Sequence, residues 1–222
     1  MSPRRLIALL GAGLAVLVVA APAEAIVGGS AVTDISVAPY QVALLINDPP
    51  LTSNRGDETC GGIIRDRTHI ITAAHCVYDW LGSGQVARPG QIGVGAGSPT
   101  LSTTTTAGRL AVRALSFQPT FDPISYDDDA AVLTLVDPLP DDAQHKAVPL
   151  VTSTAWAELQ PLRPAPPFLV TGWGSTAADD GVDPPETPAF LPALQKATVS
   201  FVDDATCAMD YQPYLIDGPS QV

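Results

Sequence analysis

The sequence has few charged residues, few basic residues and only three cysteines. Only 15% of its 222 residues are charged, and 11 lysines and arginines stand against 23 aspartates and glutamates, giving a formal net charge of −12. So acidic a chain argues against nucleic acid or an anionic membrane as its main partner, because phosphate groups are bound by a basic stripe. In a secreted protein, an odd cysteine count indicates a free thiol, an intermolecular bridge or a missing partner.

Low-complexity tracts are also lacking, and 46% of the residues are hydrophobic, as in a globular protein. The 22 prolines and 18 glycines separate short apolar runs, which predicts strands joined by turns, in an antiparallel barrel or sandwich. One helix is predicted, over 203–211, with Asp203 as its N-cap. A proline-rich stretch at 157–167 is a candidate connection between two subdomains. The predicted strands are 40–46, 63–64, 69–72, 91–97, 110–116, 130–136, 168–172 and 197–202.

The one long apolar run lies at the N-terminus. Arg4 and Arg5 precede an apolar stretch at 6–20, and Ala23 and Ala25 supply a small-x-small cleavage pattern. These features predict a signal peptide over residues 1–25 and a secreted, extracellular protein, in a compartment where disulfides form. An uncleaved membrane anchor is the alternative, although the run is shorter than the ~20 residues that a membrane span prefers.

Five short motifs follow in a fixed order. Each is weak alone, but their order and spacing resemble those of the trypsin/chymotrypsin-like serine peptidase family, over residues 26–222. The resemblance implies an all-β fold of two antiparallel six-stranded barrels with the active site in the cleft between them. It places the first barrel at 26–155 and an incomplete second barrel at 156–222. The motifs are Ile26-Val27-Gly28-Gly29, Cys60-Gly61-Gly62, Thr72-Ala73-Ala74-His75-Cys76, Asp129-Ala130-Ala131-Val132-Leu133 and Gly172-Trp173-Gly174.

The resemblance assigns two catalytic residues. His75 matches the family's general base, a role that suits histidine because its pKa lies near neutral pH, whereas His69 and His145 lie outside the motif. Asp129 directly precedes an apolar strand, as does the family's acid, which accepts the histidine N–H and fixes its tautomer. Asp128, its neighbour in a run of three aspartates, is the alternative for this role.

The family's nucleophile has no counterpart in these 222 residues. The sequence contains no Gly-Asp-Ser-Gly-Gly motif, and neither Ser175 nor Ser220 has the flanking glycines that build an oxyanion hole from backbone N–H groups. The resemblance implies a disulfide between Cys60 and Cys76, and an unpaired Cys207 whose family partner is missing. We interpret this pattern as C-terminal truncation, which also removes the segment that sets substrate preference.

These residues predict a secreted, monomeric serine endopeptidase that acts on proteins or peptides by Ser-His-Asp acyl-enzyme chemistry. No cofactor, metal, nucleic acid or membrane partner is expected after signal cleavage, and cleavage after Ala25 is expected to expose Ile26 without a separate propeptide. The 222-residue chain itself is expected to be inactive. The alternative is a non-catalytic secreted homologue that serves as a binding module. Retention of both His75 and Asp129 favours the peptidase, because inactive homologues usually lose single triad residues while keeping the whole fold.

Overall fold

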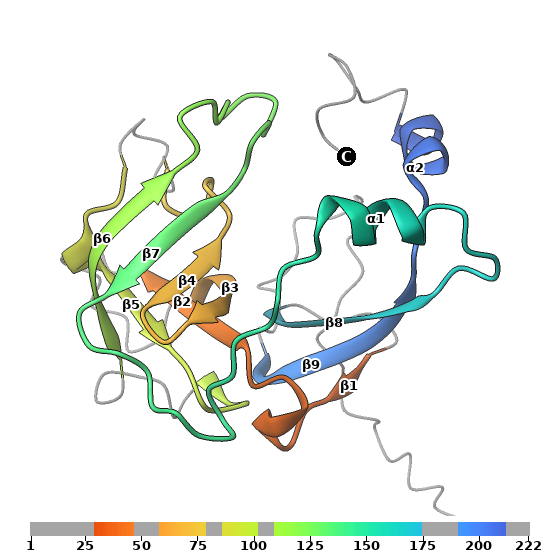
Figure 1. The fold of residues 1–222 in the computed structure, drawn as a ribbon. Helices are drawn as coiled ribbons and strands as arrows, with labels where there is room; N and C mark the ends of the chain where they lie inside the picture. Colours follow the sequence, from red (N-terminus) through yellow and green to blue (C-terminus); the bar gives the residue numbers. More distant parts are fainter. Residues whose placement is uncertain (1–28, 47–57, 79–85, 102–108, 175–190, 212–222) are drawn as a thin grey trace, which may run out of the picture.

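The structure, a computed structural model, describes residues 29–46, 58–78, 86–101, 109–174 and 191–211. Its strands form a closed barrel and a separate three-stranded sheet, which lie on opposite sides of Figure 1. The predicted all-β class is therefore confirmed for the part of the chain that is described. The predicted signal peptide lies outside these residues.

The barrel closes in the order β2-β3-β4-β7-β6-β5, and every neighbouring pair of strands is antiparallel. The apolar runs at 40–46, 69–72 and 130–136 each form one of its strands, as predicted. The run at 91–97 gives a shorter strand because residues 89–91 form a 3-10 turn before it. The strands are β2 (Gln41–Ile46), β3 (Glu58–Asp66), β4 (His69–Thr72), β5 (Ile92–Gly95), β6 (Leu110–Phe117) and β7 (Ala131–Leu135).

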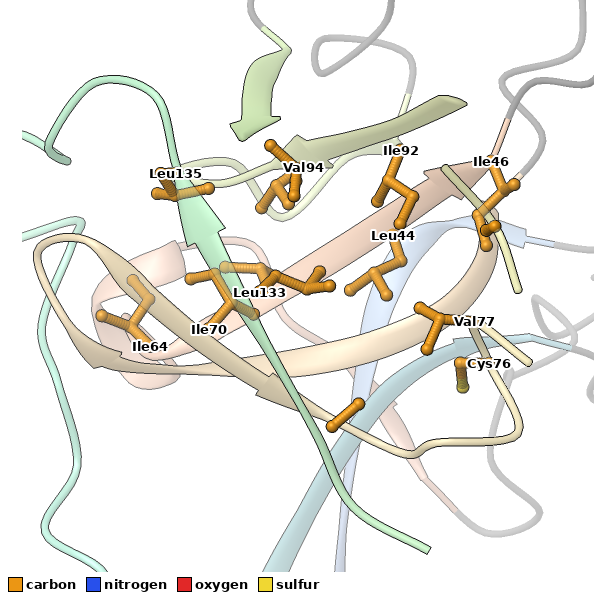
Figure 2. Packing of buried hydrophobic residues seen from close by; sticks show 14 of the residues in the cluster. Leu44, Ile46, Ile64, Ile70, Cys76, Val77, Ile92, Val94, Leu133 and Leu135 are labelled. Atoms are coloured by element: carbon orange, nitrogen blue, oxygen red, sulfur yellow. The ribbon is translucent and has the colours of Figure 1, made fainter. Parts of the chain in front are cut away.

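Branched apolar side chains from several strands fill the barrel, and Figure 2 shows them packed together. Leu44, Ile70 and Leu133 have no exposed surface. Along β7 the buried and half-buried positions alternate, as expected when one side of a strand faces the core. Gly62 is closely surrounded, because a Cβ there would lie 3.0 Å from both the Ile70 side chain and the Ile71 carbonyl oxygen, and these neighbours would have to shift. Close packing therefore accounts for one glycine of the Cys60-Gly61-Gly62 motif.

The second sheet has the order β1-β9-β8 and is antiparallel throughout. Its strands are β1 (Ser30–Ala31), β8 (Pro167–Gly174) and β9 (Leu191–Ser200). Hydrogen bonds link it to the barrel side: the Thr171 hydroxyl donates to Oε1 of Gln41 at 2.7 Å, and the Pro99 carbonyl accepts both the Leu194 N–H at 2.6 Å and the Trp173 indole N–H at 3.2 Å. Within the described ranges this sheet does not close, so the two-barrel prediction is confirmed only for its first barrel.

The helix predicted near the C-terminus is present as α2 (Asp204–Tyr211). Asp203 caps it as expected, since its Oδ1 accepts the Thr206 N–H at 3.0 Å. No helix in the described part of the chain is both long enough and apolar enough to cross a bilayer.

A second helix, α1 (Ser153–Leu159), corrects the sequence-based expectation of a single helix. Thr152 caps its first turn, accepting the Ala155 N–H at 3.1 Å, and Trp156 packs edge-to-face on Phe201 with ring centroids 5.3 Å apart. So short a helix depends on tertiary contacts. Phe201 follows β9, so the contact that favours α1 is distant in the sequence.

Candidate active site

The pairing of β4 with β7 brings together two side chains that are 54 residues apart in the sequence. Thr72 at the end of β4 lies opposite Ala131 at the start of β7. In an antiparallel pair, the residues after one strand and those before the other leave the sheet at the same end. His75 and Asp129 therefore meet at one end of the barrel.

His75 lies in a tight turn whose neighbours are anchored in the barrel. Ala74 and Val77 are fully buried, and the Val77 N–H donates to the Ala74 carbonyl at 3.0 Å. A disulfide joins Cys76 to Cys60 of β3, with Cα atoms 6.0 Å apart. Buried side chains therefore flank His75 in the turn, and the disulfide anchors the residue that follows it. The His75 side chain itself is 47% exposed.

The Asp129 carboxylate makes two hydrogen bonds with His75. Its Oδ2 lies 2.6 Å from Nδ1 of the imidazole, and its Oδ1 accepts the backbone N–H of His75 at 2.8 Å. The two bonds fix the ring in position and favour the tautomer with the proton on Nδ1. Nε2 then carries no proton and can accept one; it lies 3.6 Å from Sγ of Cys76.

The loop at 118–130 determines which aspartate faces His75. Asp128 has a positive φ of 55°, and its Oδ2 accepts the Thr120 hydroxyl at 2.5 Å. Asp129 is the next residue in the chain, and its carboxylate contacts His75. Of the two aspartates considered from the sequence, Asp129 is the one that hydrogen-bonds to the imidazole.

Tyr126 is a neighbour of this pair that the sequence analysis did not identify. Its ring lies edge-on to His75 with centroids 5.6 Å apart, it is 55% exposed, and its φ is +60°. A hydrogen bond from the Tyr126 N–H to the Asp122 carbonyl at 2.8 Å holds this part of the loop. An aromatic residue three positions before the candidate acid was the available signal, but only the loop conformation turns it towards the imidazole.

The other two histidines hold local turns together. His69 contacts Asp66 in the turn between β3 and β4, and the Thr68 N–H that donates to Asp66 is the main reason why the pKa of Asp66 falls to about 2. His145 Nδ1 lies 2.8 Å from Asp142 and lowers the pKa of that carboxyl. Neither histidine approaches the His75 pair, in agreement with their exclusion from the motif.

Of the remaining residues singled out from the sequence, one lies in the described part of the chain and three lie outside it. Cys207 lies on α2, half-buried and without a disulfide in the part of the chain that is described. Ile26, Ser175 and Ser220 lie outside the described residues. The sulfur atoms of Cys60 and Cys76 lie close to the His75 imidazole, but they are joined to each other in the disulfide and so offer no thiolate to a metal ion.

Comparison with known proteins identifies the family. The family model described as Trypsin matches residues 26–221. Trypsin zeta of Drosophila erecta is 33% identical over 156 residues, covering 70% of this chain and 50% of that protein. The vitellin-degrading protease of Bombyx mori is 29% identical over 189 residues, covering 85% of this chain and 60% of that protein. The chain thus spans about half to three-fifths of the length of these relatives.

A solved structure supports the same assignment. The crystal structure of a scabies mite inactivated protease paralogue aligns with a TM-score of 0.62 and 25% identity, over 86% of this chain and 68% of that one. Three observations point to the same family: the closed six-stranded barrel, the sequence motifs, and the match of the family model over residues 26–221. The chain therefore belongs to the trypsin family of serine proteases.

Proposed function

We propose that this chain carries the base and the acid of a serine endopeptidase site. The observation that carries the proposal is the double hydrogen bond between Asp129 and His75, at 2.6 and 2.8 Å. In the proposed reaction, Nε2 of His75 takes the proton of a serine hydroxyl as that hydroxyl attacks a peptide carbonyl. Asp129 keeps the proton on Nδ1 and stabilises the imidazolium that forms. The imidazolium then gives its proton to the leaving amine.

The substrates proposed are proteins or peptides, because the matched relatives include trypsins and a vitellin-degrading protease. The apolar run and cleavage pattern in residues 1–25 support secretion. Cleavage after Ala25 would leave Ile26 as the first residue of the mature protein. N-terminal sequencing of the secreted protein tests this point, and a mature protein that starts elsewhere contradicts it.

The proposal requires a nucleophile that these 222 residues do not supply. The sequence contains no Gly-Asp-Ser-Gly-Gly motif, and the chain covers 50% of Trypsin zeta. We place the serine and its oxyanion hole in coding sequence beyond Val222. The alternative of a non-catalytic binding module is less well supported, since the His75–Asp129 contact has the geometry that general-base catalysis needs.

The test is to read the gene beyond Val222 and to express the product of the complete reading frame. We expect a downstream serine flanked by glycines, labelling of that serine by a fluorophosphonate, and hydrolysis of casein. His75→Ala should lower kcat by about 10³-fold or more, whereas His69→Ala, a matched change of another exposed histidine paired with an aspartate, should not. A frame without such a serine, or full activity in His75→Ala, contradicts the proposal.

A further inference from the structure

Three aromatic rings pack against one another at the end of the barrel that carries the His75–Asp129 pair. They belong to Tyr78, Phe117 and Phe121, and we call them the aromatic cluster. Their centroids lie 5.6 Å apart for Tyr78 and Phe121, 6.0 Å for Tyr78 and Phe117 and 6.2 Å for Phe117 and Phe121, and every pair is edge-to-face. Aromatic pairs attract one another in this geometry at centroid separations of about 4.5–7 Å. Each ring of the cluster therefore supports the other two.

The aromatic cluster connects the two segments that carry the pair. Tyr78 lies three residues after His75, and its N–H donates to the Ala74 carbonyl at 2.9 Å, so its ring belongs to the same tight turn. Phe117 is the last residue of β6 and pairs with the first residue of β7. Phe121 lies in the loop that joins β6 to β7 and contains the candidate acid. The ring contacts therefore hold this loop against the turn of the candidate base.

Phe121 is the apolar anchor of the first half of the loop. Within residues 118–124 it is the one residue that is not exposed, and its ring packs against the barrel core. The other large apolar residue in this stretch, Ile124, is 89% exposed. The Phe121 N–H also donates to the Gln118 carbonyl at 3.0 Å. Removal of the Phe121 ring therefore takes away the main contact of this stretch with the core.

The residues on either side of Phe121 hydrogen-bond to the segment that directly precedes the candidate acid. The Thr120 hydroxyl donates to Oδ2 of Asp128 at 2.5 Å. The Asp122 N–H donates to the Asp127 carbonyl at 3.1 Å. The two halves of the loop are thus tied together on both sides of the anchored ring, and a displacement of Phe121 would displace the second half as well.

We propose that Phe121 is a positioning residue, which holds Asp129 on His75 through the aromatic cluster and the two loop hydrogen bonds. Asp129 contacts both Nδ1 and the backbone N–H of His75, at 2.6 and 2.8 Å, so both contacts depend on the place of the loop. The catalytic consequence rests on the proposed function, since a shift of about 1 Å in a catalytic group can lower a rate by about 10²-fold. The positioning itself does not rest on it.

Exchange of the His75 Nδ1 proton with water measures the positioning in the 222-residue chain. The low-field proton NMR signal of this N–H should exchange at least about tenfold faster in Phe121→Ala, because the loop opens more often. Ile124→Ala removes an exposed apolar side chain from the same loop and should change the rate by less than about twofold. An unchanged exchange rate in a folded Phe121→Ala variant overturns the proposal.

Phe201→Ala is the control for a purely structural effect. Phe201 is 8% exposed and packs edge-to-face on Trp156, so its removal also deletes a buried aromatic ring, but one that lies beyond β9. Under native conditions it should leave the exchange rate within about twofold, because local opening rather than global unfolding governs this proton. Equal acceleration in Phe121→Ala and Phe201→Ala would contradict a specific positioning role.

Phe121→Leu covers the case in which the alanine variant does not fold, as judged by circular dichroism. Leucine keeps part of the apolar contact, so the exchange rate should lie between those of the wild type and Phe121→Ala. If the alanine variant is unfolded, a folded leucine variant with the wild-type rate contradicts the proposal. Unfolding of both variants contradicts it too, because the ring would then support the whole barrel and not the loop in particular.

Activity of the complete reading frame separates this proposal from the proposed function. Phe121→Ala should lower kcat by about 10–100-fold and leave KM within about threefold. Added to Asp129→Asn, it should lower kcat by less than about threefold more, since no acid is left to position. Faster exchange in a protein whose wild type does not hydrolyse casein supports the positioning and disproves the proposed function alone. Full hydrolysis by Phe121→Ala with unchanged exchange disproves the positioning alone.

Discussion

The imidazole of His145 lies against Gly97 so closely that a Cβ at this glycine would be 2.5 Å from Nε2 of the ring. Gly97 also has a φ of +75°, a backbone conformation that residues with a side chain rarely adopt. The contact joins the segment after β5 to the segment that leaves the barrel after β7. Two separate physical reasons therefore favour glycine at this position.

Gly97→Ala should destabilise the protein by about 2–3 kcal/mol. The positive φ accounts for about 1–2 kcal/mol, and displacement of His145 from its hydrogen bond with Asp142 for about 1 kcal/mol. Urea unfolding of Gly97→Ala, His145→Ala and the double variant measures the two parts. When His145 is already alanine, Gly97→Ala should lower the free energy of unfolding only by the contribution of the positive φ, about 1–2 kcal/mol. Equal costs in both backgrounds would show that the ring contact is unimportant.

Replacing Asp129 by asparagine should release the His75 ring and lower stability by about 1.5–3 kcal/mol, because hydrogen bonds to a charged group are lost. Proton NMR should show a low-field Nδ1–H signal of His75 in the wild type that disappears in Asp129→Asn. Asp128→Asn is the control, since asparagine tolerates the positive φ at that position and the side chain faces Thr120. A signal that persists in Asp129→Asn would disprove the assigned contact.

The Cys60–Cys76 disulfide closes a loop with a sequence separation of 16. Removing it in the double variant Cys60→Ala/Cys76→Ala should lower the free energy of unfolding by about 3 kcal/mol, mainly because the unfolded chain gains conformational entropy. Cys207→Ser is a near-isosteric change of a half-buried residue without a disulfide, so it should cost about 1 kcal/mol or less. Denaturant unfolding measures both, and non-reducing peptide mapping must show the Cys60–Cys76 link. A link from Cys207 to either of the others would refute the pairing.

Asp66 should make stability depend on pH in the acid range. Its pKa is about 2 in the folded protein, against about 3.9 in an unfolded chain. A lowered folded pKa means that the contribution is complete above about pH 5 and is lost as the pH falls through the folded pKa, towards about pH 1. The difference in unfolding free energy between wild type and Asp66→Asn should therefore shrink from about 1 kcal/mol at pH 6 to near zero at about pH 1. A constant difference would contradict this.

The 222-residue chain, purified as it stands, should not hydrolyse peptide bonds. His75 and Asp129 would have no serine hydroxyl to activate, and catalysis that survives without the serine depends on an oxyanion hole. Casein hydrolysis and fluorophosphonate labelling provide the assay. Turnover that His75→Ala abolishes, or labelling of Ser175 or Ser220, would show that the nucleophile has been misjudged.

The sequence by itself predicted most of the barrel strands. Apolar runs such as 69–72 and 130–136 form strands because alternate side chains face a core, and this period is local. The His75 and Asp129 motifs and the pairing of Cys60 with Cys76 came from the family resemblance, whose spacing reflects the same β4–β7 register that the structure contains.

The tertiary structure decided what local patterns leave open. The sequence favoured Asp129 by its position before an apolar strand, but the contacts came only with the loop conformation: Asp128 has a positive φ and bonds to Thr120, whereas Asp129 faces His75. Helix α1 was not predicted because its stabilising contact runs from Trp156 to Phe201, 45 residues later. Contacts between distant segments depend on how strands and loops pack, so the sequence near each residue does not encode them.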